Sequence, residues 1–126
     1  MKSVRLSHLE SKRGTEMTAK NAIDEVNAVL PHNFDNSLLI TWLNRIEKTA
    51  AVEIEEKALD PEPAITEANQ ATRTLSIPEP YAFIYPLYLQ CMIYLLLGEY
   101  DRYSNLNGFF NTVWGDYAKR YLKSKG

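Results

Sequence analysis

Apolar residues recur three or four positions apart in several parts of the chain, which is the spacing that places them on one face of an α-helix. The first such segment is 18–30, whose apolar stripe consists of Ala19, Ala22, Ile23, Val26, Val29 and Leu30. Pro31 follows this segment and cannot continue a helix. We expect a short amphipathic helix.

A second helix is predicted after the turn at residues 31–34. Asp35 or Asn36 can cap its first turn, and we expect it to run to about Lys57. Phe34 precedes the cap and is expected to pack back on Leu38 or Leu39 as a hydrophobic staple. The predicted buried face consists of Leu39, Trp42, Leu43, Ile46, Ala50 and Ile54.

Residues 81–97 form the most apolar segment of the chain, because Gln90 is the one strongly polar residue among them. A helix that is apolar around its whole circumference is typical of a protein core. We expect Pro80 at the first helical position, where a missing N–H costs nothing, and Pro86 as an interruption. Gly98 is expected to end the helix in a left-handed conformation.

A fourth helix follows at once, and Asp101 is the candidate to cap it. Its predicted inner face consists of Tyr103, Leu106, Phe110, Val113, Trp114, Tyr117 and Tyr121. The third and fourth helices would form a hairpin with a tight corner. The predicted fold is therefore all-α, with about four helices arranged as two antiparallel hairpins.

The connection at residues 58–79 follows no helical period, since it contains Pro61, Pro63 and Pro78 among polar residues. A loop of this length is usually functional or mobile. Within it, residues 71–77 alternate enough to form a short strand, and a lone strand needs a partner. We expect that partner to be a neighbouring subunit or another protein, with Arg73, Leu75 and Ile77 at the interface.

The composition is that of one globular domain, with 126 residues of which 45% are hydrophobic and 24% charged. Residues 1–16 carry four basic and two acidic residues and show no apolar period. We expect this leader to be a disordered arm or to lie ahead of a natural start at Met17, with the helical domain spanning 17–126. It also lacks the apolar stretch of a signal peptide, which favours synthesis in the cytoplasm.

The charges are divided unevenly along the rest of the chain. Residues 17–79 hold five basic and eleven acidic residues, whereas residues 80–126 hold five basic and three acidic. Contact between an acidic face and a basic face of the next subunit would suit a ring that closes by rotation.

The apolar segment 81–97 is also a candidate membrane anchor. Its length of 17 residues lies at the lower limit of a membrane span, and its tyrosines are distributed along it instead of at its ends. We therefore prefer a buried helix and no membrane partner, and keep a membrane-associated protein as the alternative.

The residues that catalysis or metal binding would need are sparse. His8 and His32 are far from any candidate nucleophile, and the single cysteine, Cys91, is expected to be buried and inert. Glu53, Glu55 and Glu56 do not follow a calcium-loop spacing and indicate a solvated helix face. We expect no enzyme, no cofactor and no metal site.

The C-terminal cations Lys119, Arg120, Lys123 and Lys125 form the sole basic cluster. They suit a helix C-terminus, whose dipole attracts positive charge. A helical regulatory or nucleic-acid-binding module remains an alternative, although specific nucleic-acid binding is not expected of four cations on an acidic protein.

Two phrases carry a resemblance to a known family. Residues 77–81 (Ile-Pro-Glu-Pro-Tyr) and 98–103 (Gly-Glu-Tyr-Asp-Arg-Tyr) bracket the apolar helix, and a helix with Phe, Trp and Tyr follows. This arrangement resembles the small head-tail connector proteins of long-tailed phages and prophages, also called portal adaptor or head-completion proteins.

The resemblance implies a structural virion protein that forms a ring of about a dozen copies between the capsid portal and the next neck or tail protein. Such a protein would be found in the host cytoplasm during assembly and then in the virion neck. Besides the loop residues, the candidate oligomer or portal interface consists of Tyr100, Arg102, Tyr103, Lys119, Arg120 and Lys123.

Overall fold

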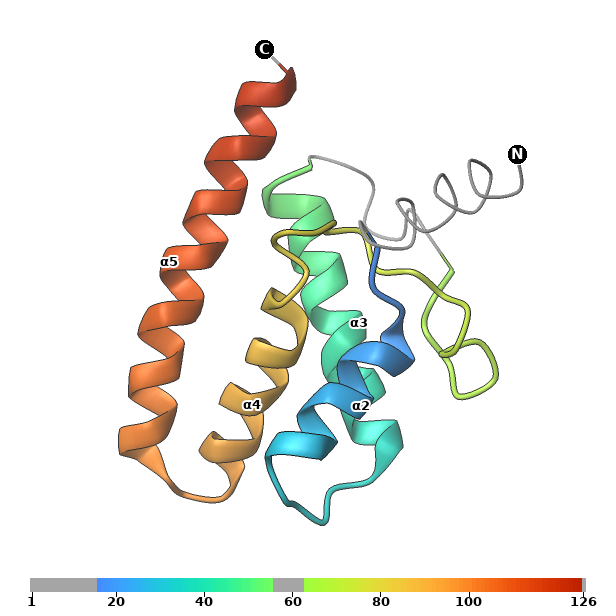
Figure 1. Ribbon diagram of the computed structural model, residues 1–126, viewed down its shortest axis with the longest axis vertical. Coiled ribbons are helices and arrows are strands. Elements are labelled where there is room, and N and C mark those ends of the chain that lie inside the picture. Colours follow the sequence, from blue (N-terminus) through green and yellow to red (C-terminus); the bar gives the residue numbers. More distant parts are fainter. Residues whose placement is uncertain (1–15, 56–62, 126) are drawn as a thin grey trace, which may run out of the picture.

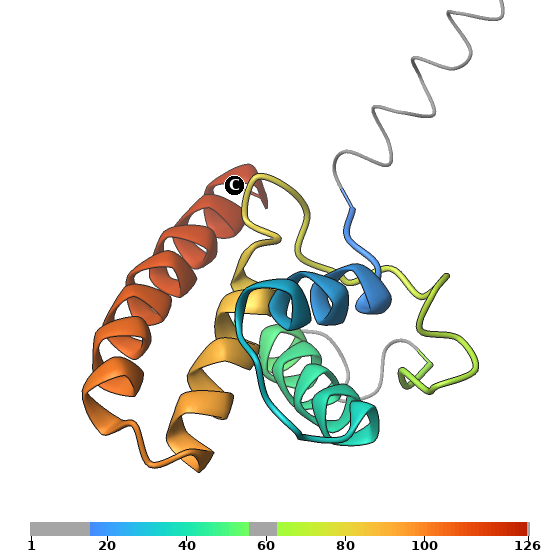
Figure 2. The same cartoon turned by 60° about the horizontal axis from the view of Figure 1, so that its bottom comes forward.

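The computed structural model describes residues 16–55 and 63–125. Over these residues the fold is all-α, as predicted, with the helices α2 (Ala19–Val29), α3 (Asn36–Glu53), α4 (Ile84–Leu96) and α5 (Tyr100–Lys125). Helix α4 lies in the middle, with α5 on one side and α2 and α3 on the other (Figures 1 and 2). Among the described helices, α5 contacts only α4.

Helix α2 begins with a capping box, in which Thr18 and Asn21 each accept a hydrogen bond from the other's backbone N–H. Its predicted stripe is buried except for Val29, which is 63% exposed. Val29 lies at the edge of the stripe and is the last residue of the helix. The chain leaves the helix after it and buries Leu30.

Helix α3 buries all six residues predicted for its inner face, although Ile54 lies just beyond the helix end. The Asp35 side chain makes no capping hydrogen bond, although Asp35 occupies the cap position. The Phe34 ring contacts Trp42 edge-on, with the ring centroids 6.1 Å apart. The helix ends at Glu53, so the predicted end near Lys57 is four residues too late.

Helix α4 begins at Ile84, later than predicted. Pro80 follows a cis peptide bond and lies in a turn, where the Tyr81 N–H donates to the Pro78 carbonyl oxygen. Pro86 therefore falls in the first helical turn, where its N–H would have no intrahelical acceptor. The predictions of Pro80 at the first position and of an interruption at Pro86 are both wrong for this reason.

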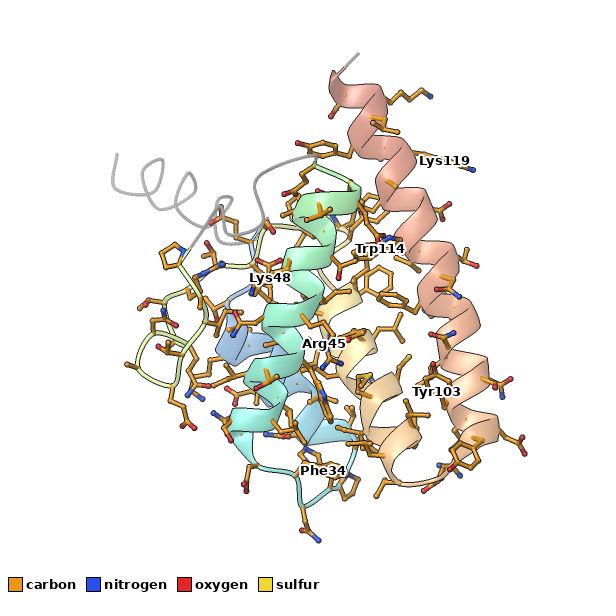
Figure 3. The ribbon with its side chains drawn as sticks, turned by 180° about the vertical axis from the view of Figure 1, so that it is seen from behind. Phe34, Arg45, Lys48, Tyr103, Trp114 and Lys119 are labelled. Carbon is orange, nitrogen blue, oxygen red and sulfur yellow. The ribbon has the colours of Figure 1, made fainter. Side chains whose placement is uncertain are left out.

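Gly98 forms the corner after α4, as predicted. Its φ of 79° lies in the left-handed region and ends the helix. Helix α5 begins at Tyr100, so Asp101 lies in its first turn instead of capping it, and its charge suits the helix dipole there. All seven residues of the predicted inner face are buried or half-buried, and the side chains of Tyr103 and Trp114 lie on the side of α5 that faces α4 (Figure 3).

The loop before α4 pairs with the chain's own N-terminal segment. Thr74 and Thr18 form an isolated antiparallel bridge, with N–H···O distances of 2.7 Å from Leu75 to Met17 and 3.0 Å from Ala19 to Arg73. No full strand forms in the described residues. The Leu75 N–H and the Arg73 carbonyl therefore have partners within the chain, and pairing of this segment with a neighbouring subunit stays a prediction.

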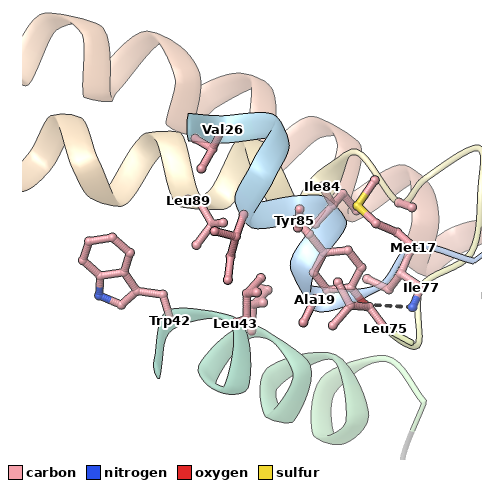
Figure 4. Packing of buried hydrophobic residues seen from close by; sticks show 14 of the residues in the cluster. Met17, Ala19, Val26, Trp42, Leu43, Leu75, Ile77, Ile84, Tyr85 and Leu89 are labelled. Atoms are coloured by element: carbon pink, nitrogen blue, oxygen red, sulfur yellow. Dashed lines mark hydrogen bonds between the residues drawn. The ribbon is translucent and has the colours of Figure 1, made fainter. Parts of the chain in front are cut away.

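Leu75 and Ile77 are 2% and 0% exposed and belong to the core that joins α2, α3 and α4 (Figure 4). We expect Leu75→Ala to lower the free energy of unfolding of the isolated chain by about 2–4 kcal/mol, through lost burial and a residual cavity. Urea unfolding followed by circular dichroism measures this change.

Leu122→Ala is the matched control, since Leu122 is exposed on α5 and its loss should change stability by under about 0.5 kcal/mol. Wild-type stability of the Leu75→Ala variant would contradict the burial of Leu75 in the core. It would favour a place for this residue in a subunit interface.

Candidate interaction surfaces

The Glu47 carboxylate on α3 is the centre of a buried polar network. It is 8% exposed and accepts hydrogen bonds from the Tyr85 hydroxyl at 2.5 Å, and from the Ser76 N–H and hydroxyl at 3.0 and 2.8 Å. The Arg73 guanidinium adds a contact at 3.5 Å. A buried carboxylate needs such partners, and here they come from α4 and from the loop before it.

Tyr85 connects this network to the core. Its hydroxyl donates to Glu47 and accepts the Ile77 N–H at 2.8 Å (Figure 4). Burial, followed by the nearby Glu47 charge, raises the pKa of Tyr85 well above its usual value. The phenol therefore stays protonated and keeps its donor role at neutral pH.

The network fixes the loop residues that were predicted to form an interface. Arg73 also donates to the carbonyl oxygens of Pro63, at 2.9 Å, and of Thr74, and its side chain is only 12% exposed. Together with the burial of Leu75 and Ile77, this places all three predicted loop residues inside the fold and not on a free surface.

Glu47 and Tyr85 were not singled out from the sequence. Glu47 follows Leu43 by four positions and precedes Ala50 by three, so it lies on the buried face of α3. A carboxylate within an apolar stripe was the signal that could have indicated it.

Aromatic rings fill the contact between α4 and α5. Tyr88 lies against Phe110 at a centroid distance of 5.7 Å, and Phe110 stacks on Trp114 at 5.5 Å. Nearer the C-terminus, Tyr117 lies between Tyr81 and Tyr121. Of these contacts, that of Tyr88 with Phe110 joins α4 to α5, and that of Tyr81 with Tyr117 joins the turn before α4 to α5.

The corner of this hairpin is exposed. Tyr100 is 65% exposed, and the neighbouring Leu96 and Leu97 are also exposed. Arg102 forms an exposed ion pair with Glu99 at 3.4 Å and lies over the Tyr94 ring at 5.8 Å. Tyr100 and Arg102 are thus both exposed at the corner, whereas Tyr103 is half-buried on the side facing α4.

Lys119, Arg120 and Lys123 are exposed near the other end of α5, and Lys119 points away from the hairpin (Figure 3). At a rise of about 1.5 Å per residue, roughly 30 Å of helix separates Arg120 from Tyr100. The predicted interface residues therefore divide into a buried loop, an exposed corner and an exposed basic end.

Reactive chemistry is sparse in the part of the chain that the structure describes. Burial raises the pKa of the Cys91 thiol to about 11, so this thiol is protonated at neutral pH, and its predicted burial is confirmed. Among residues 16–55 and 63–125, no group of three or more His, Cys, Asp or Glu could hold a metal ion.

The prediction of a solvated acidic face at the end of α3 is wrong for Glu55. Glu53 is exposed, but Glu55 is 5% exposed and its carboxylate lies 3.5 Å from the Tyr117 hydroxyl. Glu55 lies just beyond the end of α3, where Tyr117 of α5 packs against it. Glu56 lies outside the described residues.

In the described segments, no helix combines the length and apolar character that crossing a membrane requires. Comparison with protein families, with curated proteins and with solved structures finds no match for this chain.

We expect Tyr85→Phe to lower the free energy of unfolding by about 2 kcal/mol, because the Ile77 N–H and the Glu47 carboxylate both lose a buried partner. Tyr88→Phe removes a hydroxyl from the next turn of α4 and is the control, with an expected change under about 0.5 kcal/mol. Equal effects in urea unfolding would show that the network does not stabilise the loop.

The stability of the chain should also fall at alkaline pH. Burial, with Glu55 as the second cause, raises the pKa of Tyr117, and Tyr85 is raised as well. Between the unfolded value of 10.0 and the higher folded values, the folded chain binds more protons than the unfolded chain. The contribution of the protonated Tyr85 and Tyr117 hydroxyls to the free energy of unfolding is therefore complete below about pH 10. Above that pH it declines by about 1.4 kcal/mol per pH unit for each tyrosine.

Urea unfolding of Tyr117→Phe between about pH 8 and pH 11 measures this effect as a shallower decline than in the wild type. Tyr100→Phe is the matched substitution at an exposed position. An unchanged alkaline decline in Tyr117→Phe would exclude Tyr117 as a source of the pH dependence.

Proposed function

We propose that this chain is a structural protein of a phage or prophage neck, which joins the capsid portal to the tail as a ring of about a dozen copies. Its partners would be other copies of itself, the portal protein and the next neck or tail-completion protein. It would act in the host cytoplasm during assembly and remain in the virion neck. It would bind its partners without catalysing a reaction.

The observation that carries this proposal is the sequence of the α4–α5 hairpin. The two phrases that resemble connector proteins, at residues 77–81 and 98–103, flank α4 at its two ends. The first forms the turn that leads into α4, and the second forms the exposed corner that leads into α5.

The exposure of the hairpin agrees with a role in assembly. Helix α5 packs against α4 alone among the described helices, so much of its surface is uncovered in the single chain. Exposed Tyr100, Phe109 and Leu122 along α5 are apolar or aromatic residues of the kind that protein interfaces bury. This surface replaces the loop at 73–77 as the candidate for subunit and portal contacts.

Deletion of the gene from its parent phage or prophage tests the proposal. We expect electron microscopy of the lysate to show separate heads and finished tails, and complementation with the wild-type gene to restore joined virions. Normally joined particles in the deletion lysate would refute a neck function.

The same complementation assay tests the corner surface. We expect a Tyr100→Ala/Arg102→Ala double variant to keep its fold, because both side chains are exposed, and to restore about a tenth of the wild-type number of joined particles or fewer. Arg45→Ala, at an exposed position of α3, is the control and should restore normal numbers. Full activity of the double variant would exclude the corner as a contact surface.

A further inference from the structure

A cleft of about 400 Å³ lies between the end of α3, the turn before α4 and the C-terminal half of α5. Its walls include Pro78, Pro80 and the rings of Tyr81, Tyr117 and Tyr121. The volume falls within the range of about 300–1,000 Å³ that is usual for ligand sites. Two prolines and the packed tyrosines make the walls stiff, so the cleft is largely formed before any ligand arrives.

Three tyrosines line the cleft, and the Tyr117 ring contacts the other two. The centroid of the Tyr117 ring is 5.4 Å from that of Tyr81 and 6.1 Å from that of Tyr121, with interplanar angles of 55° and 50°. Because the rings are tilted to one another, they do not cover each other fully. Aromatic faces carry negative electrostatic potential and attract cations.

The charged groups of the cleft favour the same kind of ligand. Glu55 and Glu79 supply two carboxylates, of which Glu55 is 5% exposed and fixed in place against the Tyr117 hydroxyl. Arg120 lines the cleft with one positive charge, but its side chain is exposed and long enough to turn toward water. The cleft lining therefore holds two carboxylates and one guanidinium group.

We propose that this tyrosine cleft binds a lysine or arginine side chain from an extended segment of a partner protein. The cationic group contacts the faces of Tyr81 and Tyr121 and approaches the carboxylates of Glu55 and Glu79, while Pro78 and Pro80 flank the partner's backbone. This inference does not depend on the proposed neck function, because the binding belongs to the isolated chain.

Titration of the labelled chain with short capped peptides tests the proposal. The probes are acetyl-Gly-Arg-Gly-amide and acetyl-Gly-Lys-Gly-amide, with citrulline and glutamate in the central position as neutral and acidic comparisons. Chemical shifts of the tyrosine ring signals report binding at the cleft. We expect saturable shifts with the cationic peptides at a Kd of about 1 mM and at least about fivefold weaker binding of the citrulline peptide.

Substitution of the two exposed charged residues of the cleft should change peptide affinity in opposite directions and leave the core intact. Glu79→Gln should weaken binding of the arginine peptide about two- to threefold, whereas Arg120→Gln should strengthen it by a similar factor at low salt. Tyr121→Ala should weaken binding at least about fivefold. Tyr100→Ala, at the distant corner of the hairpin, should leave it unchanged.

Three results would overturn the proposal. One is the absence of saturable shifts at about 10 mM of the cationic peptides, which is tenfold above the expected Kd. The second is equal affinity for the citrulline peptide, which would make the cleft a neutral peptide groove. The third is preferential binding of the glutamate peptide that Arg120→Gln abolishes, which would make it an anion site.

Discussion

The Glu47 carboxylate constrains the arrangement of the whole chain, because a buried charge without partners would cost several kcal/mol. Its donors come from two other parts of the sequence, Tyr85 on α4 and Ser76 with Arg73 in the loop before it. The loop and both helices must therefore come together for any of these contacts to form. Tyr85 extends the constraint into the core by accepting the Ile77 N–H. The long connection is consequently part of the folded structure from residue 63 onward.

The sequence predicted the helices and most of their inner faces, because the spacing of apolar residues along a helix is a local property. Burial of the face that this spacing creates stabilises the helix directly. It failed where non-local contacts decide the outcome. The partners of Glu47 lie 26 to 38 residues away, so no local spacing could identify them. The same holds for residues 73–75, which resembled a free strand until their pairing with residues 17–19 was visible. Pro80 met the usual preference for a first helical position, but Pro86 meets it almost as well.

Internal pairing of the loop has a consequence for assembly. A backbone segment with its hydrogen bonds made and its side chains buried has few groups left to contact another chain. Exposed aromatic residues on a helix that is covered on one side can be buried in an interface. The candidate contacts of this protein therefore move from the connection to the α4–α5 hairpin. There the exposed corner at Tyr100 and Arg102 and the basic residues at the other end of α5 are too far apart to serve one small contact. The ring proposed above, with neighbours above and below it, would need two such separate surfaces.

The tyrosine cleft follows from the unequal lengths of the two hairpin helices. Helix α5 has 26 residues and α4 has 13, so α5 is longer by about 20 Å and extends beyond the start of α4 (Figure 1). The extra turns lie beside the turn before α4 and beside Glu55, which follows α3, instead of against a helix. A turn built on Pro78 and Pro80 cannot interdigitate with α5 as helical ridges do, so a hollow remains between them. Tyr117 and Tyr121 line the hollow together with two carboxylates, and these aromatic and acidic groups are the basis for proposing a cationic side chain as its ligand.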